Sequence, residues 1–245
     1  MVKLISITKT ELEELKEFSP EELIVYIARV SNPSNQLNRE TASKLISYLI
    51  KHKHWSPFEF VDMTVEITTR RSIAAQILRH WSFSFQEFSQ RYSNATKIQP
   101  IELRKQADKN RQSSAEVLND EQLETLVENA QIFSTQVYNK LLDAGVAREV
   151  ARDVLPLSTE TTMYMKGSVR DWIHYLELRT SEDTQKEHRE IANAIMDIFK
   201  KNFPNIHKSL TQKKEDTNAV LRSEGQVRDN GRQREGEEEF QGVPC

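Results

Sequence analysis

The chain has 245 residues, and its 34 lysines and arginines nearly balance 37 aspartates and glutamates, which gives a formal net charge of −3. A general polyanion-binding protein carries a strongly basic domain, so this balance argues against that class, and any phosphate site must come from a local cluster of cations. No apolar run is long enough to span a bilayer, the N-terminus lacks the apolar core of a signal peptide, and the single cysteine, Cys245, excludes an internal disulfide, so we expect a cytoplasmic protein.

Strand-like and helix-like patterns alternate along most of the chain. Val61, Met63, Val65 and Ile67 are separated by single polar residues, which is typical of a half-buried strand. Expected strands cover residues 2–8, 61–68 and 159–165, and expected helices cover residues 20–31, 39–53, 70–80, 116–142, 146–153, 169–179 and 184–203. The chain is therefore helix-rich with two or three strands, and the helix over residues 116–142 is interpreted as a core helix that ends at Gly145.

Three of these helices begin with a hydroxyl side chain that is followed three positions later by an acidic residue. In such a capping box the hydroxyl and the carboxylate satisfy backbone N–H groups that have no partner inside the helix. The three pairs are Ser19 with Glu22, Ser168 with Asp171, and Thr184 with Glu187. They set the expected starts of three helices.

Two segments lack such patterns. Residues 93–114 are polar and irregular, and we interpret them as a mobile loop over a site. Residues 215–245 are rich in Arg, Glu, Gln and Gly with scattered apolar residues, and such a segment cannot bury enough surface to offset the entropy of ordering. We therefore expect one domain over residues 1–212 and a disordered charged tail over residues 213–245.

The densest mixture of aromatic and polar residues lies between Arg79 and Tyr92. Five aromatic rings alternate there with two arginines, a histidine and a glutamate. Buried charges are costly unless they are paired or bound, and arginine offers a planar fork that matches phosphate oxygens, so the stretch indicates a site for a planar ligand that carries phosphate. The alternative is that the rings belong to the core and the charges pair with one another at a helix end.

Two histidines, His52 and His54, lie two positions apart in the sequence. A metal site would need a carboxylate or a further histidine at ligand spacing, and the neighbouring sequence has none. We expect surface or ligand-facing histidines here, and no metal.

Several motifs occur in one order along the chain and together carry a family resemblance. They are Ala28-Arg29-Val30-Ser31; His54-Trp55-Ser56-Pro57-Phe58-Glu59; Arg79-His80 followed by Glu87, Ser89, Arg91 and Tyr92; and Ala151-Arg152, Leu155-Pro156-Leu157, Arg170, Leu178-Arg179 and Gln185 with Glu187. Over roughly residues 1–210 the chain resembles the flavin-dependent thymidylate synthases, the ThyX family. It departs from the family's Arg-His-Arg and Asn-Glu-x-Ser-x-Arg-Tyr motifs at Trp81 and Gln86, and Ser168 and His174 stand where the family usually has asparagines.

The resemblance implies methylation of dUMP to dTMP, with methylenetetrahydrofolate as the carbon donor, NADPH as the reductant and FAD as the hydride carrier. A chain whose single cysteine is Cys245 suits a route without cysteine attack on the uracil ring. The resemblance also implies an α/β fold of the α+β type: a small mixed or antiparallel sheet with several helices, in a homotetramer whose active sites form where subunits meet. No Gly-rich dinucleotide fingerprint is present, which argues against a Rossmann domain.

Residue by residue, the resemblance implies one catalytic residue and two ligand-binding sets. Arg179 would contact the uracil ring and favour its ionised form, a role that suits a permanently charged guanidinium. Ser89 and the arginines would hold the nucleotide phosphate. The dUMP set is Gln76, Arg79, Glu87, Ser89, Gln90, Arg91, Arg152 and Arg179. The FAD set is Ser56, Arg79, His80, Trp81, Glu87, Ser168, Arg170 and His174.

Structural alternatives exist for several of these residues. Arg170 with Glu177, or Arg179 with Glu182, would also make ordinary surface ion pairs. The apolar residues of the helix over residues 169–179 are expected in the core: Trp172, Tyr175 and Leu176.

Two other functions are considered beside the enzyme. One is a degenerate family member that binds dUMP and FAD without turnover. The other is a single-stranded nucleic-acid binder that uses the aromatic and arginine residues between positions 79 and 92 as a stacking platform, although the negative net charge argues against it.

Overall fold

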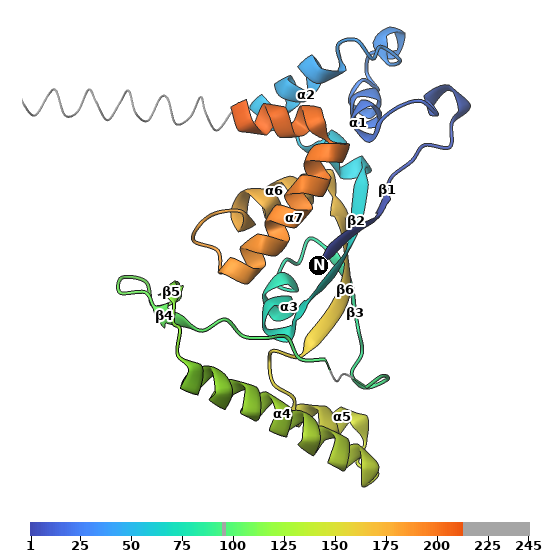
Figure 1. Ribbon diagram of the computed structural model, residues 1–245. Helices are drawn as coiled ribbons and strands as arrows, with labels where there is room; N and C mark the ends of the chain where they lie inside the picture. The colour runs from blue at the N-terminus through green and yellow to red at the C-terminus, as the bar shows by residue number, and fades with distance from the viewer. Residues whose placement is uncertain (95–96, 213–245) are drawn as a thin grey trace, which may run out of the picture.

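The computed structural model describes residues 1–94 and 97–212, which are arranged around one antiparallel sheet (Figure 1). The sheet has four strands, in the order β1 (Val2–Ile7), β2 (Asp62–Arg70), β6 (Glu160–Ser168) and β3 (Ser84–Glu87). The expected strands at residues 2–8, 61–68 and 159–165 are confirmed, and β3 lies within the aromatic and polar stretch between Arg79 and Tyr92. The fold is therefore a mixed α and β fold with an antiparallel sheet, as the resemblance implied.

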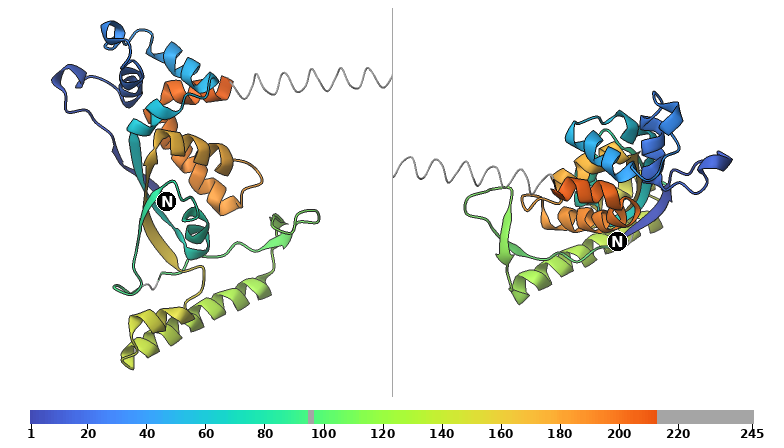
Figure 2. Two further views of the ribbon diagram at one scale, coloured as in Figure 1. Left: turned by 180° about the vertical axis from the view of Figure 1, so that it is seen from behind. Right: turned by 90° about the horizontal axis from the view of Figure 1, so that it is seen from above.

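One face of the sheet is covered by helices. Met63, Val65 and Ile67 on β2 are fully buried, whereas Thr64 and Glu66 between them point to the other face and are only partly buried. The helices α3 (Arg71–Ile77), α6 (Val169–Arg179) and α7 (Lys186–Asn202) lie on the buried side in both Figure 1 and Figure 2. The covered face thus forms the core, and α3, α6 and α7 meet one another above it.

The core ties α6 firmly to the sheet. Trp172, Tyr175 and Leu176 are at most 2% exposed, as expected. The indole nitrogen of Trp172 donates a 2.9 Å hydrogen bond to the carbonyl of Met63, and the ring of Phe83 packs with its centroid 4.7 Å from that of Trp172. The core interpretation therefore holds for Phe83, one of the five rings between residues 79 and 92.

Two of the three expected capping boxes are confirmed. At the start of α1 (Pro20–Ala28) the backbone N–H of Glu22 donates to Ser19 Oγ at 3.2 Å, and Ser168 caps α6 in the same way. The expected cap at Thr184 is wrong. The helix α7 begins one residue later, after Gln185, and the Thr184 hydroxyl instead donates to the Leu178 carbonyl at 3.2 Å, because the loop between α6 and α7 folds back on α6.

The helix expected over residues 39–53 is α2 (Ala42–Lys51), and it ends in an unusual turn. Lys53 follows it with φ of +57°, in the left-handed region. The N–H of His54 donates to the Leu49 carbonyl at 2.9 Å, which is the hydrogen bond of a helix end where glycine is usual. The chain before β2 also contains three short 3-10 helices, η1 (Glu13–Leu15), η2 (Pro33–Asn35) and η3 (Ser56–Phe60).

The end of the described chain is anchored by a buried carboxylate. After a break at Phe203, residues 204–212 are helical again. The carboxylate is that of Glu21 on α1, which is only 2% exposed. Burial raises the pKa of Glu21, and this effect is opposed by hydrogen bonds from the backbone N–H groups of Ile206, at 2.7 Å, and Asn205, at 3.2 Å. Glu21 therefore caps the start of this stretch from a neighbouring helix.

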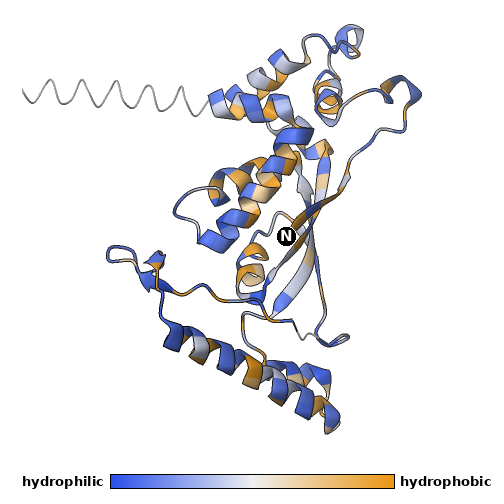
Figure 3. Ribbon diagram, viewed as in Figure 1, coloured by the Kyte–Doolittle hydropathy of each residue, from blue (hydrophilic) through white to orange (hydrophobic). Residues whose placement is uncertain are grey.

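The interpretation of residues 116–142 as a core helix is wrong. They contain α4 (Glu121–Asp143), which extends away from the sheet in Figure 1 and ends at Gly145 as expected. Tyr138 is the one buried residue of α4, whereas Leu126 is 64% exposed and Phe133 is 66% exposed. In Figure 3, α3 is largely hydrophobic, while α4 is mainly hydrophilic with separate hydrophobic positions. Apart from Tyr138, the apolar residues of α4 therefore lie outside the core that the described residues form.

The segment after α4 and the segment before it also differ from expectation. The short helix expected over residues 146–153 is split into α5 (Arg148–Ala151) and η4 (Arg152–Val154). Residues 93–114, interpreted as an irregular loop, include β4 (Arg104–Gln106), which pairs with β5 (Ser114–Val117). Polar contacts hold this hairpin, because Gln106 Nε2 lies within 3.4 Å of the carbonyls of Ala107, Asn110 and Ser113.

Across residues 1–94 and 97–212, we find no helix that combines the length and apolar character needed to cross a bilayer. The tail expected over residues 213–245 lies outside the described residues.

Candidate active site

The last residue of α6, Arg179, contacts His80. Arg179 Nε donates a 2.9 Å hydrogen bond to His80 Nε2. Because a guanidinium can only donate, His80 Nε2 carries no proton, and the imidazole is neutral with its proton on Nδ1. Burial lowers the pKa of His80 to about 4, and the charges of Arg179 and Arg79 contribute in the same direction. The guanidinium is thus oriented by a neutral acceptor.

Side chains from three helices gather around this pair. Gln76 Nε2 on α3 donates to Gln185 Oε1 at 2.7 Å. His188 on α7 is fully buried, and its ring centroid lies 6.3 Å from that of His80. The α3–α6–α7 cluster is defined as Gln76, His80, Arg179, Gln185 and His188. It brings together three residues expected in the site, and it adds His188, which sequence reasoning missed because a lone histidine on a helix resembles a core residue.

A second group lies at and after the end of β3 and directly after α5, where η4 begins, and it is called the β3–α5 group: Glu87, Ser89, Gln90, Arg91 and Arg152. Thr161 Oγ1 donates to Glu87 Oε1 at 2.9 Å. Arg91 forms an exposed ion pair with Glu149 at 3.4 Å, and Arg152 Nε donates to the Glu149 carbonyl at 3.2 Å. This group holds most of the residues expected to bind dUMP, on elements different from those that hold Gln76 and Arg179.

Two buried hydrogen-bond donors without an acceptor lie in or next to the β3–α5 group. Gln90 is 5% exposed, and its Nε2 has no hydrogen-bond partner in the described part of the chain. The same holds for Nε of Arg71, whose Nη1 lies 3.6 Å from Glu87. An unpaired buried donor is costly, so an acceptor from a ligand would be well placed here. Arg71 was not predicted, and the only sequence signal for it is the Arg70-Arg71 pair where a strand meets a helix.

A third group, the η3–α6 group, is Ser56, Glu59, Ser168, Arg170 and His174. Arg170 Nη1 lies 2.6 Å from Glu59 Oε1, and the Ser168 hydroxyl lies 3.0 Å from Glu59 Oε2. His174 packs its ring on Trp55, with the centroids 5.3 Å apart. Four of the residues expected to contact FAD thus share one location, and Glu59, which the motifs include without a role, links two of them.

Neither of the alternative surface ion pairs forms within residues 1–94 and 97–212. Arg170 pairs with Glu59 rather than with Glu177, and Arg179 donates to His80 rather than to Glu182.

The remaining residues expected at the site, Arg79 and Trp81, lie on the surface after α3. Trp81 is 92% exposed, and Arg79 forms no ion pair within the described residues. The exposed indole of Trp81 and the exposed guanidinium of Arg79, two positions apart in the sequence, are suited to a ligand with a planar ring and a phosphate.

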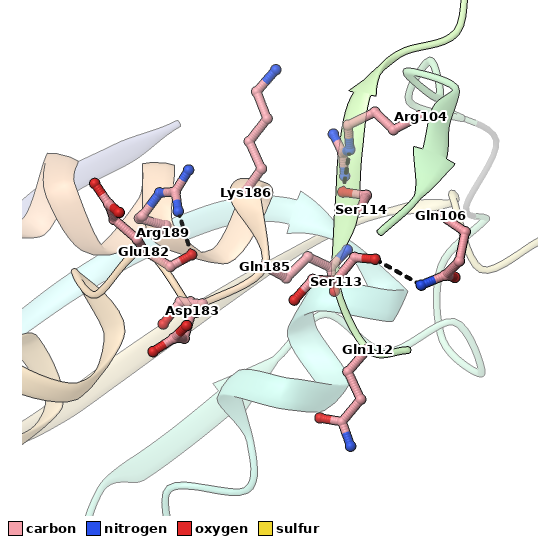
Figure 4. A pocket seen from close by; sticks show the side chains of 11 residues that line it. Arg104, Gln106, Gln112, Ser113, Ser114, Glu182, Asp183, Gln185, Lys186 and Arg189 are labelled. Atoms are coloured by element: carbon pink, nitrogen blue, oxygen red, sulfur yellow. Dashed lines mark hydrogen bonds between the residues drawn. The ribbon is translucent and has the colours of Figure 1, made fainter. Parts of the chain in front are cut away.

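A polar cavity of about 300 Å³ opens next to the α3–α6–α7 cluster, between the β4–β5 hairpin and the start of α7 (Figure 4). Gln185 belongs to both the cavity and the cluster. In Figure 4, Arg104 and Ser114 lie across from Glu182, in the loop before α7, and from Arg189 on α7. The described residues contain no group of three or more His, Cys, Asp or Glu side chains that could hold a metal ion.

Comparison with known proteins identifies the family of the chain. Residues 14–205 match the family described as thymidylate synthase complementing protein. The probable flavin-dependent thymidylate synthase of Paramecium bursaria Chlorella virus 1 is 53% identical over 212 residues, which cover 85% of this chain and 97% of the relative. The flavin-dependent thymidylate synthase of Synechocystis is 51% identical over 214 residues, covering 85% and 98%.

A solved structure shows the same fold. The UMP/dUMP methylase PolB from Streptomyces cacaoi, bound with 5-Br dUMP, superposes with a TM-score of 0.71 at 26% identity, covering 86% of this chain and 94% of that one. The family match spans most of the described residues, and the two relatives are similar over almost their full length. The chain therefore belongs to the family of flavin-dependent thymidylate synthases.

Proposed function

We propose that this chain methylates dUMP to dTMP, with FAD as bound cofactor, methylenetetrahydrofolate as carbon donor and NADPH as reductant. The contact between Arg179 and His80, in a chain of this family, carries the proposal. The reaction needs negative charge to develop on the uracil ring, and a permanent cation held in a fixed orientation stabilises such charge without a reorganisation cost. His80, being neutral, leaves the positive charge of Arg179 uncompensated at this point.

The nucleotide would be held by the dUMP set named above. Three guanidiniums, those of Arg79, Arg91 and Arg152, are available for the phosphate dianion, together with the Ser89 hydroxyl. The buried Nε2 of Gln90 supports this placement, because it lacks an acceptor within the described residues. Glu87 would orient the ring of the substrate or of the cofactor.

The residues expected to hold FAD fit that group. The exposed ring of Trp81 offers a stacking surface, and Arg79 offers a cation for the pyrophosphate. Arg170 is paired with Glu59 and would exchange that partner for the pyrophosphate. Ser56, His80, Ser168 and His174 supply hydroxyls and imidazoles for its polar edges. When bound, FAD would supply hydride to the transferred carbon, while the protein supplies binding and orientation.

We further propose that the complete site is assembled from two copies of the chain in a homotetramer. The α3–α6–α7 cluster and the β3–α5 group lie toward opposite ends of α3, whose seven residues span about 10 Å. The expected dUMP set is thus divided between two groups of elements. The exposed apolar residues of α4, among them Leu126 and Phe133, offer a surface for a second copy.

The visible absorption spectrum of the purified full chain tests the function. FAD is added first, dUMP is titrated next, and dTMP formation is then measured with methylenetetrahydrofolate and NADPH. We expect a protein-bound flavin spectrum that shifts with dUMP, followed by turnover. Bound flavin that ignores dUMP would indicate a flavoprotein of another specificity.

Two further outcomes separate the rival functions. Binding of both ligands without dTMP formation would indicate a degenerate family member, and Trp81→Arg is then the first reversion to test. Salt-sensitive oligonucleotide binding without any flavin would favour the nucleic-acid binder.

A further inference from the structure

Five side chains form one continuous run of hydrogen bonds beside Arg179. Glu187 Oε2 accepts from Gln185 Nε2 at 2.9 Å, and Gln185 Oε1 accepts from Gln76 Nε2 at 2.7 Å. Gln76 Oε1 lies 3.4 Å from His188 Nδ1, and His188 Nε2 lies 3.0 Å from the Tyr175 hydroxyl. This run, from Glu187 to Tyr175, is called the relay.

The relay has a fixed direction because its first member can only accept. Glu187 lies 2.8 Å from Arg104 and 3.2 Å from Arg70. Burial raises its pKa, but the hydrogen bonds from its own backbone, Arg104 and Gln185 outweigh that effect and lower the pKa below its usual range. The carboxylate is therefore ionised at neutral pH, and Gln185 must turn its amino group toward it.

Each later member follows from the one before it. With its amino group on Glu187, Gln185 presents its carbonyl oxygen to Gln76, so Gln76 must donate. The carbonyl oxygen of Gln76 then faces His188 Nδ1, which must carry the proton. Nε2 of His188 is left unprotonated and accepts from the Tyr175 hydroxyl. His188 is fully buried and Tyr175 is 2% exposed, so bulk water cannot replace these partners.

We propose that this relay fixes Gln76 as a hydrogen-bond donor toward the nucleotide, and that His188 is the positioning residue that does so. The inference rests on the proposed function, in which Gln76 binds dUMP. The amide oxygens of Gln76 and Gln185 are both used inside the relay, whereas each amide nitrogen keeps a second N–H. Each of these amide oxygens already accepts one hydrogen bond, so the N–H groups that remain, together with those of Arg179, favour ligand acceptors: a pyrimidine carbonyl or a phosphate oxygen.

Two substitutions of His188 separate positioning from mere packing. Asparagine places an amide near the Nδ1 position and keeps a donor for Gln76, whereas glutamine places its amide near the Nε2 position and loses that donor. Both remove a buried ring and leave one relay contact, so their effects on stability are comparable. The dissociation constant of dUMP is measured by calorimetry on each FAD-loaded protein.

We expect His188→Asn to bind dUMP within about threefold of wild type, and His188→Gln to bind about tenfold more weakly, as the loss of one orienting hydrogen bond implies. Equal losses in both variants, or no loss in either, would overturn the proposal. Failure of the wild-type protein to bind dUMP would instead refute the proposed function. Repeating the titration with deoxyuridine identifies the acceptor: a His188→Gln loss that persists places Gln76 on the base, and one that disappears places it on the phosphate.

A second measurement determines the tautomer of His188 in the wild-type protein, so it does not depend on the folding of a His188 variant. In the wild-type protein labelled with ¹⁵N-histidine, the ring nitrogen shifts report which nitrogen carries the proton. His188 is expected as the neutral Nδ1–H form at pH 7, with the His80 signal assigned through His80→Gln. Detection of the Nε2–H form or of an imidazolium at His188 would contradict the relay.

Discussion

His80 engages only one of the N–H groups of Arg179, the one on Nε, at 2.9 Å. A guanidinium has five N–H groups, and those on the two terminal nitrogens of Arg179 have no hydrogen-bond partner among residues 1–94 and 97–212. The bond to His80 thus fixes the plane of the guanidinium while leaving most of its donors available. This geometry leads to the first prediction.

Arg179→Ala should abolish dTMP formation while leaving the fold and FAD binding largely intact. Loss of an oriented charge that stabilises a reacting anion typically costs about 100-fold or more in kcat. Arg179→Lys keeps the charge without the planar fork and should recover only part of the rate. The assay is steady-state turnover, with circular dichroism and flavin absorbance as controls for folding and FAD binding. Near-normal turnover in the alanine variant would contradict the catalytic role assigned to Arg179.

The free energy of unfolding should decrease as the pH falls from 7 to 4. Burial lowers the pKa of His188 from 6.5 to about 4, and the charges of Arg179 and His80 act in the same direction. The unfolded chain therefore binds this proton below about pH 6.5, whereas the folded chain binds it only near pH 4. The contribution of neutral His188 to the free energy of unfolding is fully present above pH 6.5 and is lost progressively as the pH falls to 4. For His188 the loss is on the order of 2–3 kcal/mol.

Urea unfolding at a series of pH values measures this effect. Because carboxylates also titrate near pH 4, the informative quantity is the difference between wild type and His188→Gln, whose profile should be flatter between pH 6.5 and 4. Parallel profiles would show that His188 is not the group responsible.

Lys53→Gly should raise the free energy of unfolding by about 0.5–1 kcal/mol, because glycine adopts a positive φ without a steric penalty. The φ of Lys53 is +57°. Lys51→Gly, at the last residue of α2, is the matched control and should lower stability by a similar amount. Thermal or urea unfolding measures the stability of the two variants against wild type. A loss of stability in both would mean that the positive φ of Lys53 is not a source of strain.

Gly167→Ala should destabilise the protein by about 2 kcal/mol through crowding. A Cβ at Gly167 would lie 2.5 Å from two ring carbons of Phe83. Gly145→Ala is the contrasting variant, since φ there is +83° with open space around the new atom, and its cost of about 1 kcal/mol is conformational. Phe83→Leu should relieve part of the Gly167→Ala loss and none of the Gly145→Ala loss in a double-mutant cycle of unfolding free energies.

Phe133→Glu should reduce the mass of the assembly measured by light scattering. Phe133 is 66% exposed on α4, and a charge there would oppose burial against a second copy. Glu124→Lys, on the opposite side of the same helix, changes charge without touching that face and should leave the mass unchanged. An unchanged mass for Phe133→Glu would remove α4 as the contact surface.

Local features of the fold could be predicted and distant ones could not. The capping boxes at Ser19 and Ser168 depend on residues three positions apart, and both are confirmed. The β4–β5 hairpin escaped prediction because polar contacts of Gln106 hold it, and these leave no hydrophobic period in the sequence. The position of α4 outside the core escaped as well, since an apolar stripe does not say whether its partner is the same chain or another.

The candidate site shows the same division. The family resemblance supplied Arg179, His80 and Gln76, and the structure places these three together. Glu59 meets Arg170 only because η3 and α6 pack together across 111 positions of sequence, and no local spacing reports such a contact. The individual roles in dUMP and FAD binding stay predictions.

The pairing of β2 with β6 has a consequence for how the chain reaches its folded state. The hydroxyls of Thr68 and Thr162 meet at 3.2 Å although 94 positions of sequence separate them. Closing so long a loop costs entropy before any contact is gained, which slows folding. During synthesis the segment with Gln76 and His80 leaves the ribosome well before β6, one of the two strands that α3 contacts. The apolar side chains of α3 are exposed on that side until β6 has been made, and in this interval a chaperone has most to protect.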